Sequence, residues 1–203
     1  TNAASTVVRG GRGTWNLKSG LLQAPGPVQA IRSDGRTLSA SGLDGNTRQG
    51  YLDLQQPVTL VLESDRGRIT AGRTRWLFSA EQLESDQPIQ AELKNSKVQG
   101  RGFKLDQRTG TVIISNSCRV EQTLETLTAQ RCAWNWRSER VVADGDVVLQ
   151  RTEPEQITRA SRMEAKISDD GAIRFGQAGA RVESTIKLSP AAQEKPRRPQ
   201  VSF

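Results

Sequence analysis

Short apolar runs recur along almost the whole chain, and pairs of turn-forming residues separate them. Residues 51–54, 58–62, 112–114 and 147–149 are such runs, and Asp-Gly pairs stand between several of them. Runs that recur about every 8–12 residues are typical of β-sandwiches, barrels and jelly rolls. The pattern therefore predicts one all-β domain over residues 1–188.

Alternation of apolar and polar residues is clearest near the end of this domain. From residue 181 to residue 188, Val182, Ile186 and Leu188 lie on one face and charged or polar residues on the other. This pattern predicts a half-buried strand. Residues 189–203 contain three prolines and few apolar residues, which predicts a disordered tail.

Tryptophan recurs at a nearly constant interval along the chain. Trp15, Trp76 and Trp134 each begin a short aromatic and apolar segment, and a second matching segment follows each of them at the same distance, at 27–30, 88–91 and 146–149. Between these segments, residues 38–43 also resemble residues 98–103. We therefore expect about three copies of a unit of roughly 60 residues, each with room for four or five strands.

The repeated apolar positions are expected to share the inner face of the β-structure. One reading is structural, because an aromatic side chain at the same place in each unit packs the interior. The other reading is a binding surface, in which a partly open inner face forms a continuous apolar trough. Such a trough suits acyl chains, because each buried CH₂ contributes about 0.8 kcal/mol without needing a directional partner. The predicted lining residues are Trp15, Leu17, Val28, Leu43, Trp76, Phe78, Ile89, Phe103, Trp134, Trp136 and Val147.

The only two cysteines are predicted to form a cross-strand disulfide. If Val120 pairs with Gln130 in a hairpin, the same register places Cys118 directly opposite Cys132. Opposed antiparallel residues have Cα atoms about 4.5–5.5 Å apart, which a disulfide accepts. A disulfide implies an oxidising compartment such as a periplasm. The alternative is two reduced, buried cysteines in a cytosolic protein.

Composition excludes several classes of enzyme. The chain has no histidine and only two cysteines, so Ser-His-Asp and Cys-His nucleophiles, His-ligated zinc and a closed structural zinc site are excluded. No metal and no cofactor is predicted. With 29 Lys and Arg against 22 Asp and Glu, the formal net charge is +7, which favours anionic partners such as nucleic acid, phospholipid or lipopolysaccharide.

Two motifs in residues 76–120 carry a family resemblance. The first is aspartate, any residue, proline and a branched apolar residue, from Asp86 to Ile89. The second is glycine, any residue, glycine, an apolar residue, two further residues and aspartate, from Gly100 to Asp106. This stretch resembles the OstA-like superfamily of lipopolysaccharide-transport proteins, and most of all its LptC family. The resemblance implies a V-shaped antiparallel β-jelly roll that is open at both ends.

The resemblance also implies a function and partners. It predicts a non-enzymatic periplasmic protein that receives lipopolysaccharide from an ABC extractor like LptB, LptF and LptG, and passes it to an LptA-like bridge. A helix N-terminal to Thr1 would tether it to the inner membrane. Open sheet edges would pair with a partner or with a second copy of the chain. The predicted edge residues are Val7, Val8, Val182, Ile186 and Leu188.

Three alternatives remain at this point. One is a soluble LptA-like bridge component. Another is a basic β-protein that binds an anionic polymer, either nucleic acid or polysaccharide. Aromatic residues make up only 4% of the chain, which disfavours stacking on single-stranded nucleic acid, and no nucleic-acid partner is predicted. The third is a carbohydrate-active protein that uses Asp144 and Asp146, although Asp-Gly turns explain these residues more simply.

Overall fold

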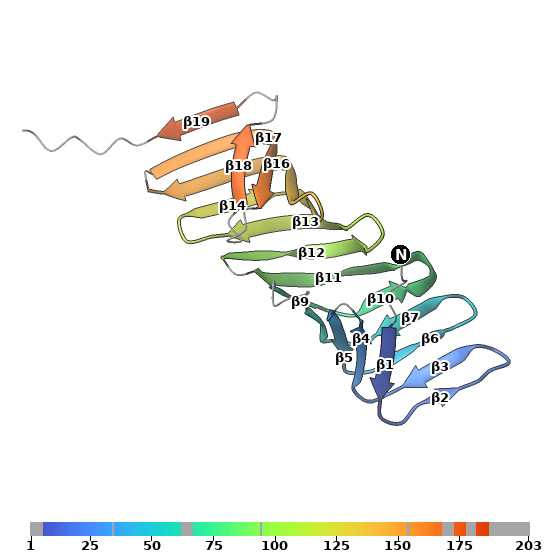
Figure 1. The fold of residues 1–203 in the computed structure, drawn as a ribbon. Helices are drawn as coiled ribbons and strands as arrows, with labels where there is room; N and C mark the ends of the chain where they lie inside the picture. The colour runs from blue at the N-terminus through green and yellow to red at the C-terminus, as the bar shows by residue number, and fades with distance from the viewer. Residues whose placement is uncertain are drawn as a thin grey trace, which may run out of the picture.

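A computed structural model of the chain describes residues 6–33, 35–61, 67–93, 95–153, 155–167, 173–177 and 182–186. Within these ranges every strand pairing is antiparallel, and the strands form one continuous sheet. The all-β fold is therefore confirmed. The strands stack along the long axis of the molecule, from β2 and β3 at one end to β19 at the other (Figure 1). The first ten strands are β1 (Thr6–Gly10), β2 (Thr14–Trp15), β3 (Leu21–Ala24), β4 (Val28–Arg32), β5 (Thr37–Ala40), β6 (Leu43–Asn46), β7 (Tyr51–Leu54), β8 (Val58–Val61), β9 (Gly67–Ala71) and β10 (Thr74–Leu77).

A short 3₁₀ turn, η2 (Phe78–Ala80), separates these strands from the longer ones that follow. In the described part of the chain no helix is long and apolar enough to cross a membrane. Leu188 and the predicted tail at 189–203 lie outside the described residues. The remaining strands are β11 (Gln82–Leu93), β12 (Ser96–Asp106), β13 (Thr111–Glu121), β14 (Glu125–Ala129), β15 (Arg131–Asn135), β16 (Arg140–Thr152), β17 (Glu155–Ile167), β18 (Ile173–Gln177) and β19 (Val182–Ile186).

The long strands bend in the middle, and this gives the sheet its V shape. In β11 the register shifts between Ser85 and Pro88, so that residues 82–84 pair with β10 and residues 89–93 with β9. Positive φ angles mark the same level in the neighbouring long strands, at Gly102 in β12 and Ser117 in β13. Both motifs of the family resemblance therefore lie at the bend. Proline supplies no N–H group to the ladder, and glycine accepts the φ of 71° at Gly102.

The bends divide the sheet into two walls. We call the wall that contains the three repeated tryptophans the first wall, and the other the second wall. The long strands run through both walls, and the short strands belong to one wall each. The first wall contains β2, β3, β6, β7, β10, β15, β18 and residues 82–85, 103–106, 111–114, 140–144 and 163–167. The second wall contains β1, β4, β5, β8, β9, β14, β19 and residues 89–93, 96–99, 118–121, 147–152 and 155–160.

The register of the ladders shows the repeat that the tryptophans predicted. Each repeated tryptophan lies opposite the residue seven positions further on. In each repeat, the branched apolar residue at the bend lies opposite a small residue, alanine or glycine. The equivalent pairs are Trp15–Leu22, Trp76–Leu83 and Trp134–Val141 in the first wall, and Val28–Ala40, Ile89–Gly100 and Val147–Ala160 at the bend.

Each repeat contains two smaller units of half its length, which we call rungs. A side-chain oxygen of Asn16, Asn46, Asp106 or Asn135 accepts hydrogen bonds from the backbone N–H groups two and three residues later, at 2.9–3.0 Å. One rung separates each of these residues from the next, except that the turn at residues 77–81 fills the longer interval between Asn46 and Asp106. The Asx turns therefore end one strand of the first wall and begin the next.

The turns stack along the side of the first wall that lies away from the bend. We call this side the rim. The N–H group of Thr47 donates to the Gly20 carbonyl at 2.8 Å, and the N–H of Trp136 donates to the Gly110 carbonyl at 2.9 Å. Gly20 and Gly110 have φ angles of 78° and 73°, in the left-handed region where glycine carries no Cβ penalty. Backbone hydrogen bonds therefore join each turn of the rim to the next.

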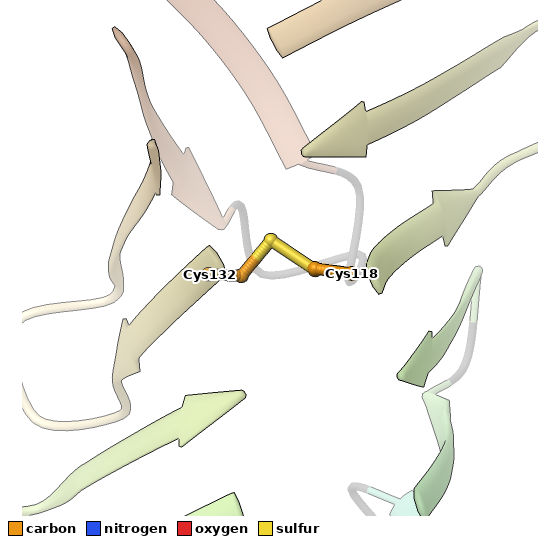
Figure 2. The surroundings of a disulfide bond; sticks show 2 residues. All are labelled: Cys118 and Cys132. Atoms are coloured by element: carbon orange, nitrogen blue, oxygen red, sulfur yellow. A yellow bond between two sulfur atoms is a disulfide. The ribbon is translucent and has the colours of Figure 1, made fainter. Parts of the chain in front are cut away.

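The cysteines form the expected disulfide, although the register that suggested it is wrong (Figure 2). Val120 lies opposite Leu127 rather than Gln130, because the chain changes wall at Gln130, between β14 and β15. Cys118 and Cys132 therefore belong to the second and first wall, on either side of the bend in β13. Their Cα atoms are 5.9 Å apart, so the bond ties the two walls together at the bend.

Removing this bond is expected to destabilise the protein measurably. The cysteines are 14 residues apart, and closing a loop of about that size lowers the entropy of the unfolded chain by the equivalent of about 3 kcal/mol. The Cys118→Ala/Cys132→Ala protein should therefore lose about 2–4 kcal/mol of unfolding free energy in urea titrations. A double variant with the wild-type urea midpoint would contradict a stabilising role.

Candidate functional site

An unbroken line of directly opposed residues crosses the first wall through all of its rungs. Each member is the ladder partner of the next, and all of them except Gly45 have apolar side chains. We call this line the first column. From the N-terminal end, it consists of Trp15, Leu22, Gly45, Leu52, Trp76, Leu83, Leu105, Val112, Trp134, Val141 and Ala165.

A second line of the same kind crosses the second wall. It begins at the exposed edge strand β1 and remains apolar as far as β16, after which Thr158 of β17 follows. We call this line the second column. It consists of Val8, Ala30, Leu38, Leu60, Ile69, Ala91, Val98, Val120, Leu127 and Leu149.

The two columns face each other across the interior of the V. A small cavity of about 20 Å³ between the walls is lined by Leu38 and Ile69 from the second column and by Leu83 and Val112 from the first. This volume is close to the roughly 10–15 Å³ that one water molecule needs. Residues of the two walls therefore pack against each other around this cavity, as two apolar faces do when they bury each other.

The predicted lining residues fall into three groups according to depth. The residues near the bend belong to the core of the domain, those of the two C-terminal tryptophan segments are half-buried, and those of the N-terminal segment are exposed. The core group is Val28, Leu43, Ile89, Phe103 and Val147. The half-buried group is Trp76, Phe78, Trp134 and Trp136, and the exposed pair is Trp15 at 59% and Leu17 at 69%.

The half-buried aromatic residues form two equivalent pairs next to the rim. The rings of Trp76 and Phe78 meet edge to face with centroids 6.3 Å apart, and those of Trp134 and Trp136 have the same separation and arrangement. Such contacts are a favourable geometry for aromatic rings. Phe78 and Trp136 belong to the rim turns, so an apolar surface continues from the first column to the free edge of its wall.

One hydrogen bond joins the rim to the opposite wall. Arg32, at the end of β4 in the second wall, donates from Nη1 to the side-chain oxygen of Gln107, which is in the rim turn after β12. The two residues are 75 positions apart in the chain. We call this bond the latch, because it connects the free edges of the two walls. Sequence reasoning missed it, since neither residue belongs to a recognisable motif.

The outer face of the first wall holds paired charges, and Asp146 at the adjoining bend is also hydrogen-bonded. The Asp53 carboxylate accepts two hydrogen bonds of 2.8 Å from Arg75, and these bonds hold its pKa below the ordinary value despite partial burial. Asp144 pairs with Arg162 at 3.0 Å, and Asp146 accepts a bond of 2.6 Å from the Gln130 amide. Among the described residues, no group of acidic or cysteine side chains could hold a metal ion.

Four of the five predicted edge residues lie in strands that have a neighbour on one side only in the described part of the chain. Within the described residues, β1 pairs with β4 alone and β19 pairs with β17 alone. Val7 and Val8 of β1 are 52% and 51% exposed. Val182 and Ile186 belong to β19.

Similarity to known proteins was found among solved structures. No protein-family model matches the chain, and the search of curated proteins found no match. Among solved structures, the chain resembles the crystal structure of LptH, described as the LptA-homologous periplasmic component of the lipopolysaccharide transport device of Pseudomonas aeruginosa. The sequences are 12% identical, the match covers 86% of this chain and 95% of LptH, and the TM-score is 0.31. With these values, the similarity assigns no function.

Proposed function

We propose that the chain is a non-enzymatic carrier for the acyl chains of lipopolysaccharide in the periplasm, with the inner-membrane role of the LptC family. The observation that carries this proposal is the pair of facing apolar columns, which run through successive rungs of the sheet. The motifs from Asp86 to Ile89 and from Gly100 to Asp106 support it, because they lie at the bends that form the V. The role of a soluble LptA-like bridge is the alternative within the same mechanism.

The columns suit a guest that slides. Each CH₂ group buried between them contributes about 0.8 kcal/mol at any point along the V, because contacts between apolar surfaces need no fixed partner. Few polar side chains interrupt the columns, so an acyl chain would meet similar surroundings at successive rungs. A guest would replace contacts that the two walls now make with each other. The free-energy cost of separating the walls is thus partly offset by contacts with the lipid.

Direct capture of a lipid tests this proposal. A photo-crosslinking amino acid in place of Phe78, at the rim, should capture lipopolysaccharide on irradiation. The matched control is the same amino acid in place of Lys104, which is exposed on the outer face of β12. Capture should be strong at position 78 and weak at position 104, as measured by immunoblotting for lipopolysaccharide. Equal capture at both positions, or none at position 78, would count against the carrier function.

Separation of the walls is the step that loading requires, and the latch lies where they must part. Arg32→Cys and Gln107→Cys can be joined by a bis-maleimide, because the structure holds no free cysteine that would compete. The bridged protein should capture much less lipid than the same variant blocked on both thiols with N-ethylmaleimide. Undiminished capture by the bridged protein would show that lipid binds without opening at the latch.

We also propose that the two open ends dock other β-jelly rolls of the same kind. The first column ends at Trp15 in β2 and the second at Val8 in β1, both edge strands, so strands added to β1 and β2 would extend the sheet and both columns together. The occupant this favours is therefore an LptA-like neighbour or a second copy of the chain, rather than an unrelated peptide.

Self-association tests this docking in its simplest form. Proline at Val7 or Val8 removes one backbone N–H group each, and one of the two groups points away from β4 because donors alternate along an edge strand. One of these variants should lose the concentration-dependent rise in mass that sedimentation velocity detects for the wild type. Gly11→Pro, in an open position beyond β1, is the control. A wild type that remains monomeric at all concentrations would contradict pairing between copies.

A further inference from the structure

The third residue of the rim turns is basic in four of the five turns. Counting from the Asx residue or its equivalent, the sequences are Asn-Leu-Lys-Ser-Gly, Asn-Thr-Arg-Gln-Gly, Asp-Gln-Arg-Thr-Gly and Asn-Trp-Arg-Ser-Glu. The turn at 77–81 differs, because its third residue is Ser79. All four cationic side chains are exposed. They are Lys18, Arg48, Arg108 and Arg137.

Two of these arginines are held in the same way on the preceding turn. Arg48 Nη2 donates to the Leu17 carbonyl at 3.3 Å, and Arg137 Nη2 donates to the Gln107 carbonyl at 3.1 Å. Their stems cross the preceding glycine so closely that a Cβ at Gly20 or Gly110 would lie 2.8 Å from the arginine Cγ. One donor of each guanidinium is therefore used to fix it on the rim. Its remaining N–H groups are available to a ligand that approaches from outside.

The cations form two stations along the rim. Successive turns are two strands apart, which corresponds to about 9–10 Å, so Lys18 lies near Arg48 and Arg108 lies near Arg137. The turn at 77–81, with Ser79 in the third position, separates the two stations. Apolar residues of the same turns, Leu17 and Trp136, come directly before Lys18 and Arg137 in the chain. The rim therefore joins an apolar interior to a row of exposed positive charge.

We propose that this row binds the phosphate groups of the lipid while its acyl chains lie between the walls. The inference rests on the proposed carrier function and names the part of the lipid that remains outside. Phosphate is the chemistry that a pre-positioned guanidinium recognises best, through parallel charge-assisted hydrogen bonds. The two stations give a sliding lipid two successive anion sites, one on each side of the third turn.

The probes for this site are two forms of lipid A. One carries both phosphates, and the other has had its phosphates removed. The Arg108→Gln/Arg137→Gln protein should bind the phosphorylated form about fivefold to tenfold more weakly than the wild type, since two exposed charge-assisted contacts are lost. Its affinity for the dephosphorylated form should not change. The Lys97→Gln/Lys104→Gln protein loses the same charge from the outer face, where both lysines are exposed, and should bind both forms like the wild type.

A gain of function complements this loss. Ser79→Arg places a cation at the third position of the turn at 77–81, and it should strengthen binding of phosphorylated lipid A alone. This variant keeps the test decisive if loss of Arg137 disturbs the turn. Equal binding of both lipid forms by the wild type, unaffected by any of these substitutions, would overturn the phosphate site and leave the carrier function standing. Failure of the wild type to bind either form would overturn both.

Discussion

Cross-strand register is the constraint on which the rest of this structure depends. An antiparallel ladder places side chains of alternate residues on opposite faces, so a shift of one residue would exchange the inner and outer faces of a wall. The Asx turns and the bends hold this register at both ends of each strand. As a result, the residue opposite Trp15, Trp76 or Trp134 is always the one seven positions later. The continuity of the apolar columns follows from that constant offset.

Several features of the fold could be predicted because they are local or periodic. The all-β class followed from short apolar runs and Asp-Gly pairs, and the threefold repeat followed from the spacing of tryptophans. The disulfide was predicted from a register that is wrong by several residues, because the change of wall at Gln130 leaves no signal in a pattern of apolar residues. The rungs were missed because aspartate replaces asparagine at position 106, and the turn at 77–81 lacks both the Asx residue and the glycine.

The candidate site was harder to predict than the fold, because its state depends on contacts between the walls. The sequence indicates which residues point inward, but not how closely two apolar faces approach each other. Val28, Ile89 and Val147, expected in an open trough, lie in the core near the bend. The latch joins residues 75 positions apart, and no local pattern contains information about such a pair. The basic residues of the rim were visible in the sequence, but their alignment appears only when the turns are stacked.

The stacking of the rim turns has a consequence for the history and engineering of this architecture. Each turn bonds to its immediate neighbours, so the molecule resembles a solenoid in which stability accumulates from one layer to the next. Duplication or deletion of one whole rung would leave the register of every remaining pair of strands unchanged. The length of such a molecule is therefore set by the number of its rungs. Evolution can change that length in discrete steps without altering the residues of the interior.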